Sequence, residues 1–222
     1  EDLQAHGSLN AVAWAAAGHG AVLACASGSG SVTVLSHQGI IKAVGSDGDV
    51  THHWQLQTFP AHTEPALCVS WASPPVAAEA ALGLSGARFA SVSASDLRIW
   101  RWEEKRCSWV QEQKSSAPSD ASSAARPFRS VAWKPWSGGR EALAVAGGTA
   151  MTIWLGEQEG ADWRWRLSKE VEIGCSAWSV QWADTGNVAL VSCGVGSGGQ
   201  VVLIKENLAG EWDIMEPEME DV

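Results

Sequence analysis

The sequence predicts an all-β fold, and three observations lead to that prediction. The chain has 222 residues, of which 14 are Trp, 23 are Gly and none is Tyr. Its apolar residues fall in short segments and alternate there with small or polar residues, which is the period of a β-strand. Turns containing Gly separate these segments, as in proteins built from many short antiparallel strands.

Composition limits the functions open to the chain. Charged residues make up 18% of it and the formal net charge is −10 without a long basic run, which argues against nucleic acid as the main ligand. No apolar run is long enough to span a bilayer and no secretory signal is visible, so we expect at most a peripheral relation to membranes. The Cys residues are far apart and form no CxxC motif, which predicts reduced thiols. They are Cys25, Cys68, Cys107, Cys175 and Cys193.

A Val-x-Trp motif recurs along the chain roughly every 50 to 60 residues. Each copy is followed by a second and a third apolar segment, and then by a fourth segment that contains Trp. The motif Trp residues are Trp14, Trp71, Trp133 and Trp182. The second segments are 22–27, 88–93, 142–146 and 188–192, and the third are 31–35, 96–100, 151–154 and 201–204. The fourth contain Trp54, Trp109, Trp163 with Trp165, and Trp212.

Four strands per unit at this period predict a WD-repeat β-propeller in which each unit is one blade. We place the blades at about 5–60, 61–115, 120–172 and 173–213, in a single domain 1–213 followed by an acidic tail, 214–222. An ordinary β-sandwich rich in Trp is the alternative.

The second unit contains the residues that lock a WD blade, which are a His, a Ser or Thr, an Asp and a Trp joined by hydrogen bonds. These are His62, Ser91 or Ser93, Asp96 and Trp100. The first unit keeps His6 but has Gly30 in the turn where Asp is expected, so the repeats are degenerate. We predict a structural role within the blades for His62, Asp96, Trp100, Trp14, Trp71, Trp133, Trp154 and Trp182.

Four blades are few for a closed ring, since propellers have about four to eight. The pattern supplies no strand that would fasten the last unit to the first. Either four blades close alone, or the chain forms an open arc, and the open arc is the prediction. Open strand edges are sites where another chain pairs.

Several segments, taken in the order in which they occur along the chain, resemble the Sec13 family. Members of this family are small WD-repeat subunits of the COPII vesicle coat. The segments of the last unit that carry the resemblance are 177–182, 186–192, 201–206 and 210–212. Further matching segments are 22–27, 61–63, 88–91, 97–100 and 112–114. The resemblance covers residues 5–213 and corresponds to blades three to six of a six-bladed family. It implies an open ring into which a partner chain inserts a seventh blade.

The resemblance also implies a function. It indicates a non-catalytic scaffold subunit of the COPII coat in ER-to-Golgi transport and of the nuclear pore complex. The implied partners are the large helical COPII coat subunit and nuclear-pore scaffold proteins. The implied locations are the cytoplasmic side of ER exit sites and COPII vesicles, the nuclear pore and the lysosome or vacuole surface. The implied partner edge lies in the last blade at Val201, Val202, Leu203 and Ile204.

A generic WD-repeat adaptor that binds peptides at the propeller face is the alternative function. We predict no enzyme, cofactor, metal site or small-molecule substrate. Gly194–Gly199 matches GxGxxG, but a strand follows it where nucleotide binding needs a helix, so we expect a hairpin loop. His52 and His53 point to opposite faces of a strand and do not readily chelate one ion.

Overall fold

The computed structural model describes residues 7–42, 50–73, 84–117, 127–135, 141–159, 162–195 and 198–215. Within these residues the chain forms four antiparallel sheets of four strands each and one 3-10 turn, η2 (Ala17–His19). The all-β prediction is confirmed. No helix among the described residues is long and apolar enough to cross a membrane. His6 lies outside the described residues.

Each sheet is a meander in which the strands pair in chain order. The first contains β1 (Leu9–Trp14), β2 (Val22–Ser27), β3 (Ser31–Lys42) and β4 (Val50–Pro60). The second contains β5 (Cys68–Trp71), β6 (Arg88–Val92), β7 (Asp96–Glu103) and β8 (Ser108–Ser116). The third contains β9 (Phe128–Trp133), β10 (Glu141–Gly147), β11 (Ala150–Glu159) and β12 (Asp162–Glu172). The fourth contains β13 (Ser176–Trp182), β14 (Val188–Val195), β15 (Gly198–Glu206) and β16 (Trp212–Met215), which ends beyond the boundary expected at residue 213.

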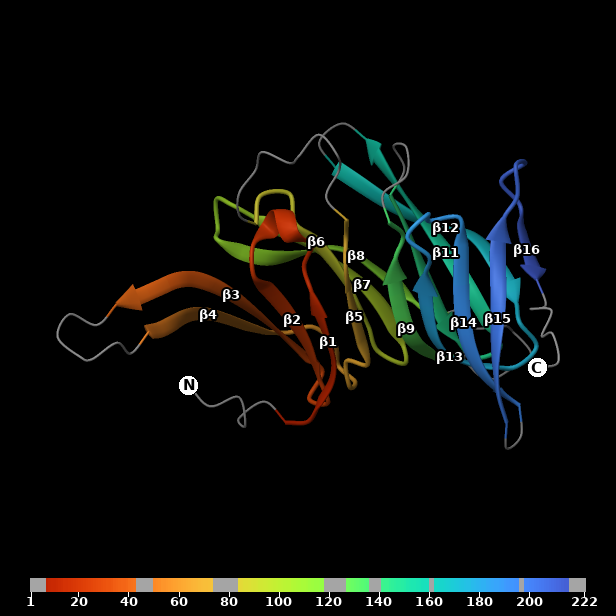
Figure 1. Ribbon diagram of the computed structural model, residues 1–222, viewed down its shortest axis with the longest axis horizontal. Coiled ribbons are helices and arrows are strands. Elements are labelled where there is room, and N and C mark those ends of the chain that lie inside the picture. The colour runs from red at the N-terminus through yellow and green to blue at the C-terminus, as the bar shows by residue number, and fades with distance from the viewer. Residues whose placement is uncertain are drawn as a thin grey trace.

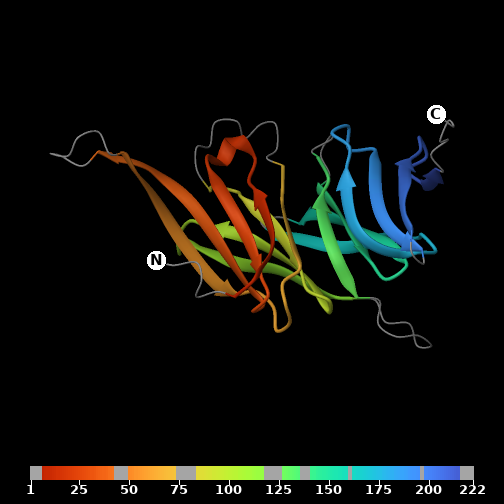
Figure 2. The same ribbon diagram turned by 60° about the horizontal axis from the view of Figure 1, so that its bottom comes forward.

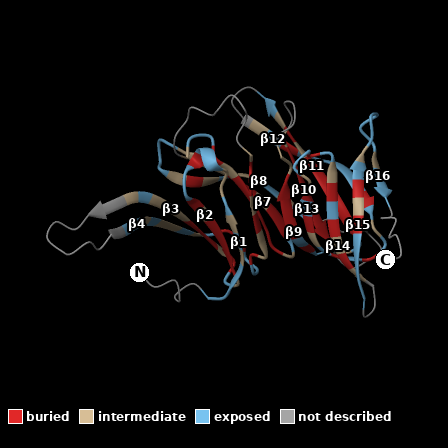
Figure 3. Ribbon diagram, viewed as in Figure 1, coloured by how far each residue is buried: buried red, intermediate tan, exposed pale blue. Residues whose placement is uncertain are grey.

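The sheets are blades of a propeller that does not close. They follow one another in chain order, with the first and the last at opposite ends of the molecule (Figures 1 and 2). The first strands of the blades contact one another in the order β1, β5, β9, β13. Buried residues gather where neighbouring blades face each other (Figure 3). The open WD-repeat arc is therefore confirmed.

The Val-x-Trp motif builds the contacts between blades. The indole N–H of Trp71 donates to the Ala13 carbonyl of the preceding blade at 2.9 Å, and that of Trp182 donates to the Ala132 carbonyl at 3.0 Å. Trp133 is buried in a cluster with residues of the second blade. Each of these Trp residues thus points back towards the blade before it.

The preceding blade receives the Trp in a notch, by which we mean a pair of small side chains on its first two strands. One member directly precedes the motif Trp, and the other is its partner across the ladder. The pairs are Ala13 with Ala24, Ser70 with Ala90, and Ala132 with Ala144. Because these side chains are small, the indole of the next blade can approach the main chain and find its acceptor.

Each motif Trp also packs against a Trp of the fourth strand in its own blade. The ring centroids are 6.5 Å apart for Trp14 and Trp54, 5.5 Å for Trp71 and Trp109, 5.1 Å for Trp133 and Trp165, and 5.4 Å for Trp182 and Trp212. The three later pairs lie between blades, but Trp14 is 62% exposed. Trp14 thus contacts the fourth strand of its own blade, but no sheet among the described residues packs against its other side.

The cysteines differ from the prediction. Cys175 and Cys193 form a disulfide, so the expectation that all thiols are reduced is wrong. Cys175 directly precedes β13, and Cys193 pairs with Ala177 on the neighbouring strand, which brings the two side chains together inside the last blade. A separation of 18 residues in sequence gave no sign of this contact.

Candidate functional site

The second blade is locked by a chain of buried hydrogen bonds. The Trp100 indole N–H donates to Ser91 Oγ at 2.9 Å, and the Ser91 hydroxyl donates to His62 Nε2 at 2.7 Å. His62 Nδ1–H in turn donates to Asp96. This assignment of donors is the one that gives every member a partner. The four residues expected from the sequence are thus brought together, with Ser91 as the hydroxyl that contacts His62.

Asp96, the last member of this series of hydrogen bonds, has further polar partners. Ser93 Oγ lies 3.0 Å from Asp96 Oδ1, Arg98 Nη2 lies 3.1 Å from Oδ2, and Lys114 Nζ lies 3.4 Å from Oδ2. Burial alone would raise the pKa of Asp96, but the hydrogen bonds from His62, Arg98 and Ser93 favour its charged form. The pKa of Asp96 therefore lies below its usual value, and the carboxylate stays ionised.

The same residue types form hydrolytic triads, but this arrangement cannot act as one. A serine nucleophile must reach a substrate carbonyl, and Ser91 is 0% exposed while its oxygen already accepts the Trp100 N–H. His62 is also buried. The cluster consequently stabilises the blade.

Burial lowers the pKa of His62 below the ordinary value of 6.5, more than the neighbouring Asp96 raises it. An unfolded chain takes up a proton on this His near pH 6.5, whereas the folded chain does so only at lower pH. The free energy of unfolding should therefore fall as the pH drops below 6.5. Urea unfolding across this range measures the slope. His62→Gln should flatten it, and replacement of the exposed His53 by Ala should leave it unchanged; an equal slope in both variants would contradict this origin.

A half-buried charge cluster joins the second and third blades, with residues from β6 and β8 of the second and from β10 and β12 of the third. Arg88 lies 3.1 Å from Glu112 and 3.0 Å from Glu141, and its guanidinium stands 4.4 Å from the centre of the Trp163 ring. Burial raises the pKa of Glu141, and Arg88 partly opposes this rise. The cluster explains why two carboxylates can lie between blades.

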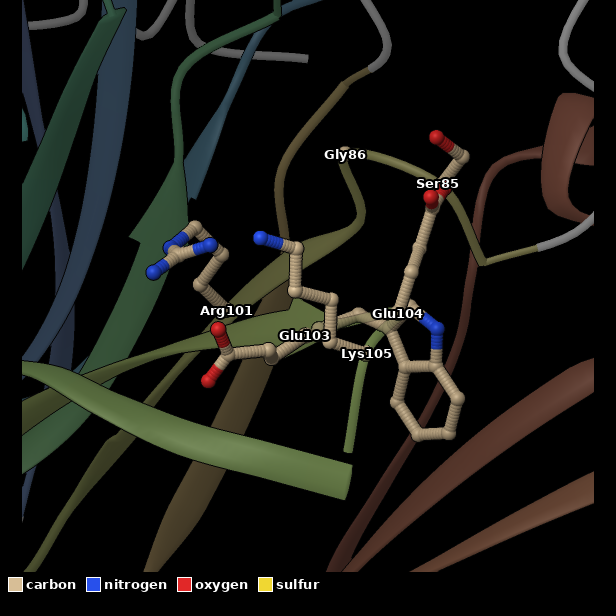
Figure 4. A pocket seen from close by; sticks show the side chains of 7 residues that line it. Ser85, Gly86, Arg101, Glu103, Glu104 and Lys105 are labelled. Carbon is tan, nitrogen blue, oxygen red and sulfur yellow. The ribbon is translucent and has the colours of Figure 1, made fainter. Parts of the chain in front are cut away.

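A surface hollow of about 310 Å³ lies between the β7–β8 turn and the segment before β6 (Figure 4). Its lining includes the basic Arg101 and Lys105 and the acidic Glu103 and Glu104. Its mixed charges favour neither an anion nor a cation, and the hollow contains no His or Cys.

The other candidate site is the outer face of the last blade, the side turned away from the third blade. We define this outer face by the side chains of Trp178, Leu190, Val201, Leu203 and Met215. The exposed fractions are 52% for Trp178, 38% for Leu190, 47% for Val201 and 45% for Met215. Trp178 lies over Gly194, where an added Cβ would come within 2.3 Å of the indole. Sequence reasoning missed Trp178 and Leu190, because the strand pattern alone does not show which face of the last blade is left uncovered.

The predicted partner edge, Val201 to Ile204, lies on β15, the third strand of the last blade. β15 pairs with β14 along its length, and Leu203 and Ile204 also pair with Met215 and Ile214 of β16. The main chain at Leu203 and Ile204 is therefore not free for strand addition; the sheet edges are β13 and β16. Val202 and Ile204 are buried towards the third blade. Only Val201 and Leu203, of the four predicted residues, face outwards.

Comparison with known proteins agrees with this architecture. A chain in the crystal structure of the mitotic checkpoint complex, a WD-repeat propeller, matches with a TM-score of 0.59 and 16% identity, over 94% of this chain and 52% of that one. No family model matches. Together with the four meander blades and the locked His–Ser–Asp–Trp cluster, this defines the chain as a WD-repeat β-propeller protein.

Curated relatives of the chain include Sec13 proteins. The match to "Protein transport protein SEC13" of Cryptococcus neoformans is 28% identical and covers 93% of this chain and 62% of the relative. "Protein SEC13 homolog" of Drosophila melanogaster is 31% identical over 92% and 54%, and "Protein transport protein sec13" of Aspergillus clavatus is 30% identical over 93% and 64%. The chain is thus homologous to the Sec13 proteins and spans 54 to 64% of the length of these three.

Proposed function

We propose that the chain is a non-catalytic scaffold subunit of the COPII coat and of the nuclear pore complex. In this role it binds a partner that adds a blade at the open side of the last blade. The partners would be the large helical COPII coat subunit and nuclear-pore scaffold proteins, at ER exit sites, on COPII vesicles and at the nuclear pore. The lysosome or vacuole surface is a further proposed location.

The observation that carries this proposal is the exposed outer face of the last blade. The corresponding faces of the first three blades are buried under the next blade, and residues there such as Ala24, Ala90 and Ala144 are 0% exposed. An apolar sheet face of this kind is typical of a protein-binding surface. The names of the relatives, which describe protein transport, support the choice of partner.

Copurification tests the function. The tagged natural protein should recover the helical coat subunit or pore scaffold proteins in near-equal amounts at high salt, as identified by mass spectrometry. High salt matters because it weakens exposed charge contacts but not apolar burial. Recovery of the protein alone and monomeric would contradict the scaffold proposal and favour the peptide-binding adaptor.

Val201→Asp tests the face. A charge buried without a partner in the interface should weaken binding by about tenfold or more. Because Val201 is 47% exposed in the free chain, the fold should be retained. Leu208→Asp is the matched control, since Leu208 is fully exposed in the β15–β16 turn. Equal loss of binding in both variants, or in neither, would place the interface elsewhere.

A further inference from the structure

Two histidines meet on the hairpin formed by β3 and β4 in the first blade. His37 Nε2 lies 3.1 Å from His52 Nδ1, and the centroids of the two rings are 5.3 Å apart. This contact is exposed to solvent. Neither ring has another hydrogen-bonding partner among the described residues. The pair is therefore open to a small ligand from solution.

A β-bulge brings the two rings together. His37 is opposite Trp54 in the ladder, but the register then shifts by one residue, so that His52 is opposite Ile40. His52 and Trp54 share one face of β4 because they are two residues apart, and the bulge places the His37 ring on that same face, 5.0 Å from the Trp54 ring. Sequence reasoning compared His52 only with His53, which points to the opposite face. The strand pattern does not reveal a register shift of this kind.

The distance between the two nitrogens suits a metal ion. Zn²⁺ binds imidazole nitrogens at about 2.0 to 2.1 Å, so two of them stand about 2.9 Å apart at a right angle and about 3.3 Å apart at the tetrahedral angle. The distance of 3.1 Å between His37 Nε2 and His52 Nδ1 lies between these values. A neutral imidazole can carry its proton on either nitrogen, so the shared proton has only to move to the far nitrogen of the donor ring. An ion can thus replace the hydrogen bond when the two rings turn about their side-chain torsions.

The chemistry of the two ligands selects the kind of ion. Imidazole suits Zn²⁺, Ni²⁺ and Cu²⁺, whereas Ca²⁺ and Mg²⁺ prefer oxygen ligands. Among the described residues no cluster of three His, Cys, Asp or Glu side chains could hold a metal ion. Two rings therefore supply part of the coordination sphere, and water takes the other positions. A site of this kind exchanges its ion with solution, unlike a structural zinc site with four protein ligands.

An ion at this position would fasten a part of the hairpin that has little other support. We call residues 37–42 of β3 and 50–54 of β4 the outer part of the hairpin. β2 pairs with β3 only from Val32 to Ser36, so in the outer part β3 pairs with β4 alone among the described strands. The outer part reaches beyond β1 and β2 (Figures 1 and 2). Because a two-stranded ribbon is only marginally stable in water, a link across it has a large effect.

We propose that His37 and His52 form a binding site for Zn²⁺ or a related divalent transition-metal ion. The ion joins β3 to β4 and stabilises the outer part of the hairpin. The site lies in the first blade, at the opposite end of the molecule from the outer face of the last blade (Figure 1). It is therefore independent of the proposed function.

Calorimetric titration of the chain with Zn²⁺, at a pH where imidazole is neutral, tests the site. His37→Gln and His52→Gln should each weaken binding by about tenfold or more, because loss of either ring turns a chelate into a single-ligand contact. His53→Gln is the matched control, since His53 is also exposed but faces the other way, and it should bind as the wild type does. Every chain carries Cys107→Ser, because the exposed Cys107 thiol is itself a zinc ligand.

Amide hydrogen exchange measures the effect on the hairpin. Zn²⁺ should slow exchange in the outer part for the wild type and His53→Gln, but not for His37→Gln or His52→Gln. Circular dichroism verifies that each variant is folded. Three results would overturn the site: no binding at millimolar Zn²⁺, an equal loss in His53→Gln and His52→Gln, or a loss in only one of His37→Gln and His52→Gln. Binding without slower exchange would refute the stabilisation of the hairpin.

Discussion

Asp96→Ala is expected to lower the free energy of unfolding by about 3 to 5 kcal/mol, the usual cost of removing one partner from a buried charged network. Asp96 is 4% exposed and accepts from His62, Ser93 and Arg98. Without it the His62 ring loses its acceptor in a place that water does not reach, and Arg98 loses its carboxylate. Urea unfolding followed by Trp fluorescence measures the change.

An exposed ion pair provides the control. Arg164 lies 3.0 Å from Glu159, with side chains 76% and 53% exposed. Arg164→Ala should cost at most about 1 kcal/mol, because water screens such pairs and replaces their contacts. If Arg164→Ala and Asp96→Ala lower the free energy of unfolding by similar amounts, the burial of Asp96 does not account for its contribution to stability.

The sequence was informative wherever one blade determines its own structure. Strand period, Gly turns and the recurring Trp predicted four strands per blade, since these signals are local. The locking cluster was predictable for the same reason: His62, Ser91, Asp96 and Trp100 belong to one repeat. Ser91 was separated from Ser93 only by the structure, which shows which hydroxyl contacts the His ring.

Contacts that the repeat pattern does not encode were not predictable from the sequence. Trp14 and Trp71 have the same motif, yet Trp14 is 62% exposed and Trp71 is 7% exposed, because of the two only Trp71 has a described blade packed against its face. The pairing of β15 on both sides could not be read from an apolar segment, since sheet edges depend on which strands come next to it. The contact of Cys175 with Cys193 depends on how a connector enters β13.

Gly30 is a further feature of this kind, and Gly30→Ala is expected to destabilise the chain by about 2 to 5 kcal/mol. Its φ of +82° costs any L residue about 1 to 2 kcal/mol. An added Cβ would also come within 2.5 Å of the His62 carbonyl oxygen and 2.7 Å of that of Glu64. Both are main-chain atoms, so the entry to the second blade would have to move. Urea unfolding measures the loss.

Gly210→Ala separates the two causes. Gly210 ends a turn in the same way as Gly30, since each donates its N–H to the carbonyl three residues before it. It has a φ of +79° but no atom within 4 Å of the position of an added Cβ, so it should show only the backbone cost of about 1 to 2 kcal/mol. If Gly30→Ala costs no more than Gly210→Ala, the close approach to His62 does not matter. A larger loss for Gly30→Ala would show that the turn at Gly30 is coupled to the His62 cluster of the second blade. The two are already joined, because the Gly30 carbonyl accepts the His62 N–H at 2.7 Å. The double variant with Asp96→Ala should then lose less than the sum of the single losses, since both changes disturb the position of His62. Gly30 stands at the turn position where a WD repeat has Asp. Through this turn, Gly30 would connect the first blade to the hydrogen-bonded cluster of the second blade.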